Sequence, residues 1–175
     1  MPPADPASGG STRSIPRWLL VAAAAFLVAR VATGIFEQRH PPIQAELVQW
    51  HPAGAGEMQS RSTGLPVLYD FSAEWCGPCQ KMQREVFADR SSAQTINGLF
   101  VPVRLVDRQR EEGRNPPDVG ALQARYQVDA FPTLVVAPAD GSQPTVIVGY
   151  PGKAALMQQL TAAGVKARLQ RGPVR

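Results

Sequence analysis

The chain of 175 residues contains only two cysteines, Cys76 and Cys79, which are separated by Gly77 and Pro78. No other disulfide can form within the chain, so the two cysteines react with each other or with another molecule. The pair follows a β-type apolar run, residues 67–71, and precedes a helical pattern. Because Cys-x-x-Cys in that setting is typical of a redox site, the sequence predicts a reactive pair of sulfurs where a strand leads into a helix.

The position of Cys76 predicts its role in thiol chemistry. A cysteine at the N-terminus of a helix faces the positive end of the helix dipole and unpaired backbone N–H groups, which favour the thiolate over the thiol. We therefore expect Cys76 to be the accessible, attacking sulfur. Cys79 lies one turn later on the same face and can attack the mixed disulfide that Cys76 forms with a partner, which releases the partner reduced. Pro78 falls in the first helical turn, where its missing N–H costs nothing.

The residues around the cysteines resemble a known family. Residues 67–79 read VLYDFSAEWCGPC, which resembles the active-site strand and helix start of thioredoxins nearly residue for residue. Residues 80–87 are more similar to exported thioredoxin-like domains, including the C-terminal domain of the transmembrane reductase DsbD. The resemblance implies a thioredoxin fold that uses no cofactor other than its redox-active disulfide.

The order of the expected elements indicates an α/β fold, with a mixed central β-sheet flanked by helices. Apolar runs and alternation predict strands, and helical spacing predicts helices. Residues 54–64 are expected to form a loop with at most one helical turn, and the polar segment 108–117 is expected to be an exposed insertion that is too charged to pack. We expect strands over residues 46–50, 67–71, 100–106, 133–137 and 145–149, and helices over residues 79–89, 91–97 and 153–163, the last ended by Gly164.

Asp70 interrupts the apolar strand that leads to the cysteines. A buried carboxylate without a partner is costly, so its pKa should rise and it can take up and return a proton. In thioredoxins the matching acid helps to deprotonate the second cysteine, and the resemblance implies that role for Asp70. The alternative is an acid at a strand end that is hydrogen-bonded to the backbone.

Residues 130–133, Ala-Phe-Pro-Thr, match the cis-proline loop of the family. The resemblance implies that Pro132 lies beside the cysteine pair. The backbone before it, at Phe131, would then pair with an extended substrate segment in the manner of a strand. The alternative is an ordinary trans proline that opens a strand, since few X-Pro bonds are cis.

Trp75 and Gly149 also match family positions that flank the site. The resemblance implies that Trp75 shields Cys76 and offers partners a flat contact surface, and that Gly149 leaves room for the substrate chain. The alternatives are plain packing for Trp75 and a turn at the end of a strand for Gly149.

The N-terminal part of the chain predicts export. Residues 1–14 have no apolar period and are expected to be disordered. Residues 15–36 carry an apolar run long enough for a transmembrane helix, and a shorter part of the same run suits a cleaved signal peptide. Residues 37–44 would be a spacer, residues 45–164 the thioredoxin-like domain and residues 165–175 a basic tail that is either solvated or in contact with anionic lipid.

Several classes of function find no support in the sequence. The chain has no phosphate-binding loop, no basic surface interleaved with aromatic residues and no Ser/His/Asp arrangement, so we expect neither nucleic-acid binding nor hydrolysis. His40 and His51 each precede a proline, and no second cysteine pair exists. We therefore expect no metal site, because a zinc site usually needs four ligands.

The sequence thus predicts a protein-disulfide reductase whose partners are disulfide-containing proteins. It would be held in a bacterial-type inner membrane by one N-terminal helix, with the catalytic domain facing the periplasm, or be soluble there after cleavage of a signal peptide. Gly77-Pro78 is similar to the dipeptide of the reducing family members. With no further cysteines, the chain would need a separate membrane electron donor.

Two alternatives remain open at this point. One is a disulfide oxidase or isomerase, which a reduction potential would separate from a reductase. The other is a non-catalytic binding or assembly factor with a thioredoxin fold, for example in cytochrome c maturation, whose activity would survive replacement of both cysteines.

Overall fold

The computed structural model describes residues 17–39 and 47–170. Contacts within the chain divide it into two compact units, Met1–Ile43 and Gln44–Arg175. The expectations for residues 1–14, for residues 40–44 of the spacer and for residues 171–175 of the tail lie outside the described residues.

The first unit contains helix α1 (Arg17–Arg39). Its apolar side chains from Trp18 to Val31 are exposed, and the Arg30 guanidinium lies 5.9 Å from the centre of the Phe26 ring. In the described parts of the chain, no helix is both long enough and apolar enough to cross a membrane. The anchor predicted for residues 15–36 stays a prediction.

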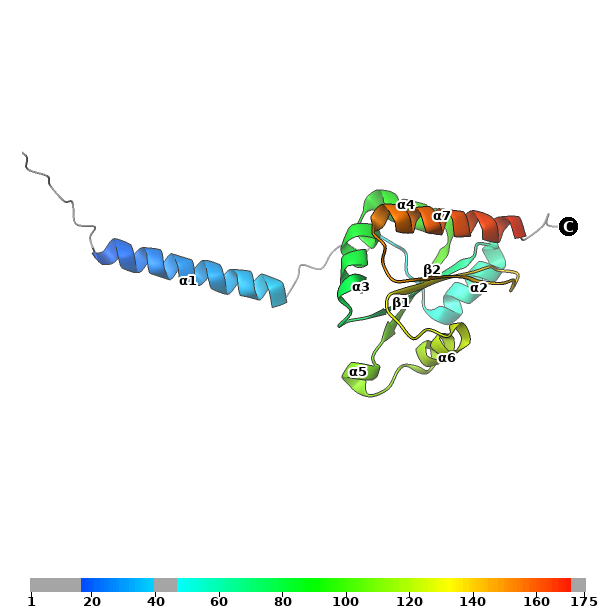
Figure 1. The fold of residues 1–175 in the computed structure, drawn as a ribbon, viewed down its shortest axis with the longest axis horizontal. Helices are drawn as coiled ribbons and strands as arrows, with labels where there is room; N and C mark the ends of the chain where they lie inside the picture. The colour runs from blue at the N-terminus through cyan, green and yellow to red at the C-terminus, as the bar shows by residue number, and fades with distance from the viewer. Residues whose placement is uncertain (1–16, 40–46, 171–175) are drawn as a thin grey trace, which may run out of the picture. The chain divides into compact units, whose positions relative to one another are not determined.

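The second unit is built on a four-stranded mixed sheet (Figure 1). Its strands are β1 (Val67–Ala73), β2 (Val101–Asp107), β3 (Thr133–Ala137) and β4 (Thr145–Val148), in the order β2-β1-β3-β4. Strands β1 and β2 are parallel, whereas β3 is antiparallel to both β1 and β4. The predicted α/β class with a mixed central sheet is therefore confirmed.

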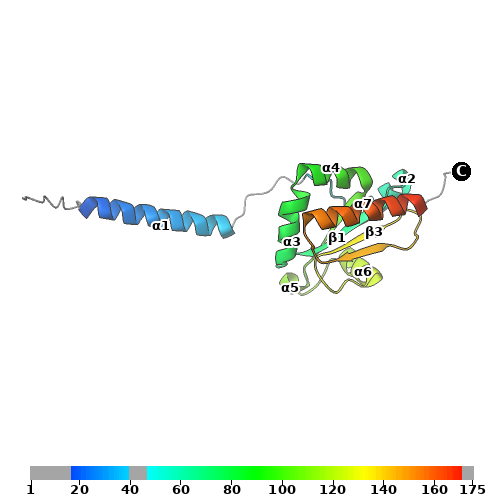
Figure 2. The ribbon, with the colours of Figure 1, turned by 45° about the horizontal axis from the view of Figure 1, so that its top comes forward.

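Helices cover both faces of this sheet (Figure 2). Because successive side chains of a strand point to opposite faces, Leu68 packs on one side of β1, and Val67, Tyr69 and Phe71 pack on the other. Asp70 therefore shares the face of Leu68. That face is covered by α3 (Gly77–Met82), the π-helix η1 (Gln83–Phe87), α4 (Arg90–Leu99) and α7 (Lys153–Gln170), and the opposite face by α2 (Ala53–Thr63) and α6 (Pro117–Tyr126).

The segment before β1 differs from the expectation. Helix α2 occupies residues for which we predicted a loop, and the Cα of Gly56 lies so close to the Val103 side chain that a Cβ there would clash. The predicted strand over residues 46–50 is absent from its described part, residues 47–50. The backbone groups of that segment bond to the Asn97 side chain instead of to a neighbouring strand. Asn97 Oδ1 accepts a hydrogen bond from Gln49 N at 3.0 Å, and Asn97 Nδ2 donates one to Leu47 O at 3.0 Å.

Helix α7 runs through Gly164, where we predicted its end, and continues to Gln170. A Cβ at Gly164 would lie 2.9 Å from Cζ of Phe100. The glycine is therefore needed for the close approach of α7 to the buried Phe100 ring, not for a helix stop. Residues 165–170 of the predicted tail are accordingly helical.

The segment 108–117 is exposed over much of its length, as expected, and contains the short helix α5 (Gln109–Glu112). It is not an unpacked insertion, because Asn115 within it hydrogen-bonds to the buried Asp107 and to Gln123 of α6. Its polar side chains thus fix the segment to the body of the domain.

Candidate active site

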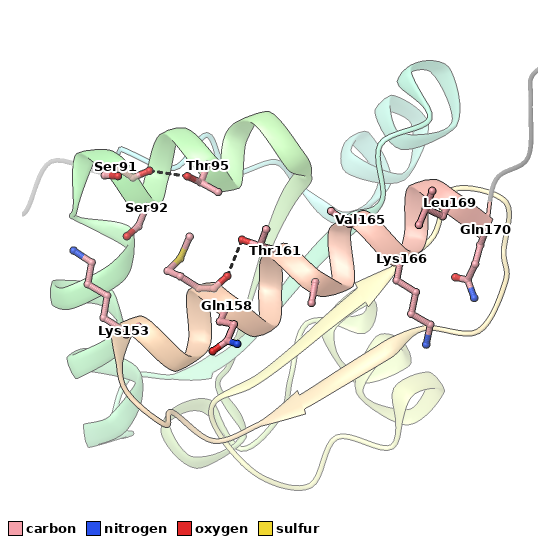
Figure 3. A pocket seen from close by; sticks show the side chains of 13 residues that line it. Ser91, Ser92, Thr95, Lys153, Gln158, Thr161, Val165, Lys166, Leu169 and Gln170 are labelled. Carbon is pink, nitrogen blue, oxygen red and sulfur yellow. Dashed lines mark hydrogen bonds between the residues drawn. The ribbon is translucent and has the colours of Figure 1, made fainter.

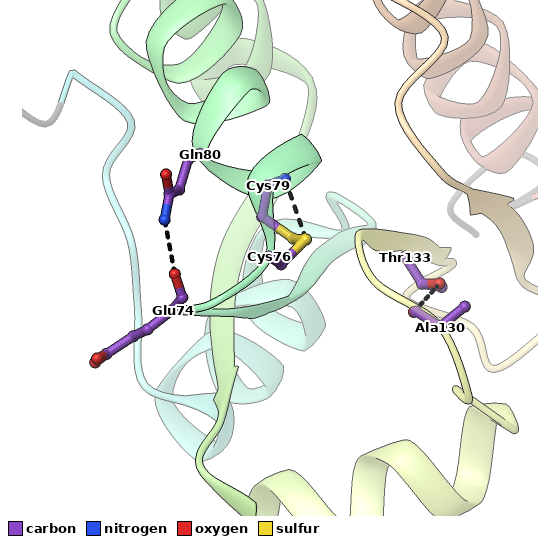
Figure 4. Close-up of a disulfide and its surroundings, with 6 residues drawn as sticks. All are labelled: Glu74, Cys76, Cys79, Gln80, Ala130 and Thr133. Atoms are coloured by element: carbon purple, nitrogen blue, oxygen red, sulfur yellow. Dashed lines mark hydrogen bonds between the residues drawn. A yellow bond between two sulfur atoms is a disulfide. The ribbon is translucent and has the colours of Figure 1, made fainter. Parts of the chain in front are cut away.

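The two cysteines lie where the sequence placed them, at the junction of β1 and α3 (Figure 4). Cys76 is the N-cap of α3, and its Sγ accepts a hydrogen bond from Cys79 N at 3.2 Å. Pro78 lies in the first turn, where its lack of an N–H is harmless. The two sulfurs are bonded to each other, with the Cα atoms 5.3 Å apart. The structure therefore represents the oxidised form of the cysteine pair.

Both cysteines are more buried than the expected accessible nucleophile. Cys76 is 3% exposed and Cys79 is 6% exposed, and Phe131 packs against them. Trp75 is 48% exposed, and its ring meets the Phe131 ring edge to face, with centroids 6.0 Å apart. The two rings form an aromatic border beside the disulfide, so a partner that reaches the sulfurs must contact this border.

The cis-proline loop has the conformation implied by the resemblance. The Phe131–Pro132 peptide bond is cis, and Thr133 Oγ1 donates a hydrogen bond to Ala130 O at 2.8 Å (Figure 4). Gly149 N donates to Pro132 O at 2.8 Å, which brings these two predicted substrate-binding residues together. Gly149 has φ 81°, a conformation that favours glycine, and the space beside its Cα is open.

Asp70 is 2% exposed, and its pKa is raised from its ordinary value of 3.8 to about 6. The main cause is loss of water on burial, and the nearby Arg104 guanidinium opposes it by favouring the carboxylate. Oδ2 accepts a hydrogen bond from Arg104 Nε at 3.3 Å, whereas Oδ1 is buried and has no hydrogen-bond partner among the residues described. The carboxyl therefore has one oxygen held by a cation and one at which a proton can reside.

Arg104, the ion-pair partner of Asp70, was not predicted from the sequence. Its guanidinium lies 4.0 Å from the Trp50 ring centre and 5.6 Å from the Phe87 ring centre, and it donates to Gln83 Oε1 from η1. Asp70 and Arg104 are direct neighbours in the parallel register of β1 and β2. The sequence signal for this pair is a single arginine within the apolar run 100–106, because a charged side chain on a buried strand needs a partner.

Asp70 lies on the face of the sheet that is covered by the helix of Cys79, but it does not hydrogen-bond to the cysteines. Asp70 points to the side of the sheet that α3 covers, and α3 carries Cys79. Within the described chain, Asp70 makes no hydrogen bond to either cysteine in the oxidised form. The arrangement provides a titratable carboxyl below the helix that carries the second sulfur, and its proton-transfer role stays a prediction.

Other features of the molecule lie outside this site. Within residues 17–39 and 47–170, no group of three His, Cys, Asp or Glu side chains is arranged to hold a metal ion. A groove between α4 and α7 is lined largely by apolar atoms of residues such as Met157, Val165 and Leu169 (Figure 3). Its lining includes neither cysteine, so the groove is separate from the redox pair.

The sequence is similar to those of characterised redox proteins. A family model described as a thioredoxin-like domain matches residues 57–164. Thioredoxin of Mycobacterium tuberculosis strain H37Rv is 36% identical over 103 residues, which are 57% of this chain and 75% of that protein. The thiol:disulfide interchange protein DsbD of Ralstonia nicotianae is 31% identical over 90 residues, which are 51% of this chain but only 14% of that protein.

Solved structures agree with the fold. The DsbH oxidoreductase has a TM-score of 0.59 and 25% identity, and the match covers 70% of this chain and 88% of that one. The oxidised C-terminal domain of DsbD from Neisseria meningitidis has a TM-score of 0.52, and the match covers 63% of this chain and 90% of that one. At 20% identity it supports the fold alone. With the family model spanning residues 57–164 and the bonded pair at the start of α3, the chain belongs to the thioredoxin-like family and is a thiol–disulfide oxidoreductase that works through Cys76 and Cys79.

Proposed function

We propose that this oxidoreductase reduces disulfides in proteins of an extracytoplasmic compartment. In the reduced chain, the Cys76 thiolate attacks one sulfur of the partner's disulfide, and the other partner sulfur leaves as a thiolate and takes up a proton. Cys79 then loses its proton and attacks Cys76, which closes the Cys76–Cys79 bond and releases the second partner thiol. Two thiols of this chain are oxidised to one disulfide, and one disulfide of the partner is reduced to two thiols.

The observation that carries this proposal is the bonded pair at the N-terminus of α3, with Cys79 N donating to Cys76 Sγ. The same N–H, together with the helix dipole, favours a thiolate at Cys76 after reduction. The partner's chain would lie along the aromatic border of Trp75 and Phe131 and beside Pro132, where the backbone before β3 is outside the sheet.

The direction of the reaction is inferred from the residues between the cysteines. Gly77-Pro78 resembles the dipeptide of reducing family members, and the relatives reported above include thioredoxins. We therefore expect a reduction potential closer to that of thioredoxin, about −270 mV, than to that of DsbA, about −120 mV. Equilibration of the full chain with glutathione buffers measures this value, and a potential near the DsbA value would replace the reductase by an oxidase.

The compartment is inferred from the N-terminal sequence. Arg13 and Arg17 precede an apolar run, the pattern of an export signal. Outside the cytoplasm the pair would be reduced by a separate membrane dithiol donor, since the chain has only two cysteines. Cell fractionation with N-terminal sequencing of the mature chain tests this: periplasmic or inner-membrane protein supports export by either route, whereas cytoplasmic protein excludes it.

The substrate class is tested by trapping. The full chain with Cys79→Ala should accumulate mixed disulfides between Cys76 and its partners, because the second sulfur is no longer present to release them. The matched control carries both Cys76→Ala and Cys79→Ala and should trap nothing. If the Cys79→Ala chain forms no dithiothreitol-sensitive adducts, or if the double variant keeps full activity in cells, the protein acts as a binding factor instead.

A further inference from the structure

The segment after β2 is held in place by a buried polar cluster. Asp107 is buried, and its Oδ2 accepts hydrogen bonds from Asn115 Nδ2 at 2.6 Å and from Gln123 Nε2 at 2.8 Å. Its Oδ1 accepts from Gln109 N at 3.1 Å, and Asn115 Oδ1 accepts from Arg108 N at 2.6 Å. Both ends of the segment are thus joined to one carboxylate, which gives α5 a defined position.

This position places α5 against the active-site loop. Arg108 Nη2 lies 3.3 Å from Glu74 Oε1, and the Arg110 guanidinium lies 5.4 Å from the centre of the Trp75 ring. Glu74 O in turn accepts a hydrogen bond from Gln80 Nε2 of α3 at 2.8 Å (Figure 4). In Figures 1 and 2, α5 lies next to the end of α3 that carries the cysteines. The segment is therefore part of the surface around the disulfide.

The charges at this junction are not all compensated. Arg108 pairs with Glu74 and also with Glu112, so the two acids share one cation. Arg110 is exposed, and none of the described carboxylates lies within ion-pair distance of its guanidinium. Glu111 is its neighbour in sequence, but adjacent residues of a helix do not face each other. The cation that lies over Trp75 is therefore available to a partner.

The geometry points to Arg110 as a residue that determines substrate specificity, and we infer that it favours protein disulfides with an acidic side chain beside the reacting cysteine. This inference rests on the proposed reductase function and adds to it the chemistry of the substrate. A guanidinium that lies over an indole keeps its N–H groups free for a carboxylate, which it can bind through two parallel hydrogen bonds. Trp75, which the substrate must pass, holds that cation at the border of the site.

The test uses the full chain, reduced and freed of reductant, and peptides that contain one intramolecular disulfide. The peptides differ only at the residue next to the attacked cysteine, which is Asp in one and Asn in the other. The second-order rate constants give an Asp-to-Asn ratio in which any general loss of rate cancels. For the unmodified chain we expect a ratio of about three to five at low salt, the effect of one exposed charge pair, and a lower ratio at high salt.

The variants distinguish a specific site from general electrostatics. Arg110→Gln should bring the Asp-to-Asn ratio to about one, and Arg110→Lys should keep part of it because the charge remains but the planar fork is lost. Arg114→Gln is the matched control, since it removes the same charge from the same exposed segment, and it should leave the ratio as it was. An unchanged ratio in Arg110→Gln, or an equal loss in Arg114→Gln, overturns the inference. Failure of the unmodified chain to reduce even the Asn peptide overturns the reductase function itself.

Discussion

At the scale of single residues, Asp70 and Arg104 form a buried ion pair on the face of the sheet that carries α3. Burial raises the pKa of Asp70 to about 6, although Arg104 opposes the shift. An arginine cannot give up its proton in a protein, so Asp70 is the member of the pair that titrates. A carboxyl with a pKa near neutrality can both accept and return a proton at the pH of most compartments.

The raised pKa predicts how stability depends on pH. The folded chain binds the Asp70 proton more tightly than the unfolded chain. The stabilisation of the fold by this proton is therefore complete below pH 4 and is lost as the pH rises through about 6. At pH 7 the ionised carboxyl lowers the stability of the fold by about 3 kcal/mol, because the pKa is about 6 in the folded chain and 3.8 ordinarily. Asp70→Asn should therefore raise the free energy of unfolding of the oxidised protein by up to about 3 kcal/mol at pH 7, with little gain at pH 4. Urea unfolding across this range measures it, and a gain that is the same at every pH would contradict the assignment.

The same substitution tests the proton-transfer role. Asp70→Asn should slow release of the partner near neutral pH, because Cys79 loses the carboxylate that takes its proton. General-base assistance contributes about 10² or more in rate when a side chain is well placed. Stopped-flow measurement of partner release against pH is the readout, and an unchanged profile would show that Asp70 has a structural role only.

Arg104 can be tested separately from Asp70. Arg104→Gln removes the charge that favours the carboxylate, so the pKa of Asp70 should rise above 6. Carbon-13 NMR titration of the Asp70 carboxyl in the oxidised protein measures the shift. Arg104→Lys keeps a positive charge and is the control that should leave the pKa closer to about 6. A pKa that stays the same or falls in Arg104→Gln would mean that the ion pair is not what limits the shift.

At the scale of elements, two helices approach their neighbours closely at glycines. Gly56 brings α2 onto Val103 of β2, and Gly164 brings α7 onto Phe100. The expectation of a helix stop at Gly164 was wrong for a physical reason: the same residue type serves a left-handed turn and a close approach, and only the neighbouring element decides between them. The helix α2 was missed because glycines in a short polar stretch favour a loop.

Two glycine substitutions should have opposite signs. Gly164→Ala places a Cβ 2.9 Å from Cζ of the buried Phe100 ring, and such overpacking costs about 1–3 kcal/mol, more than the helix propensity that alanine gains. Gly98→Ala, in α4, meets nothing within 4 Å and should stabilise the protein by about 0.5–1 kcal/mol. Thermal or urea unfolding of both variants measures the difference. A stabilising Gly164→Ala would show that Phe100 moves aside at no cost.

At the scale of the whole molecule, the buried core lies in the second unit, and all of its described members fall between residues 48 and 167. A chain that begins at Gln44 should therefore unfold cooperatively and exchange disulfides with small peptides at a rate within about twofold of the full chain. Circular dichroism melts and peptide reduction assays measure both properties. A fragment without a cooperative transition would show that the first unit is needed for folding.

The sequence determined the local features of this protein. The sequence predicted the cysteine pair at the start of a helix, the apolar strand before it, the two strands β3 and β4 and the cis bond at Pro132. Spacing, alternation and a family motif act over short stretches of chain. Even the burial of Asp70 followed from the apolar run around it.

Only the tertiary structure decided how distant residues combine. Asp70 pairs with Arg104, which is 34 positions away in the sequence. The Asn97 side chain hydrogen-bonds to the backbone of Leu47, 50 positions away, where a neighbouring strand would otherwise do so. Arg110 lies over Trp75 because hydrogen bonds from Asp107 to Gln109 and Asn115 hold the segment that carries it. Such contacts depend on strand register and on which polar groups find partners, and neither leaves a periodic signal in one sequence.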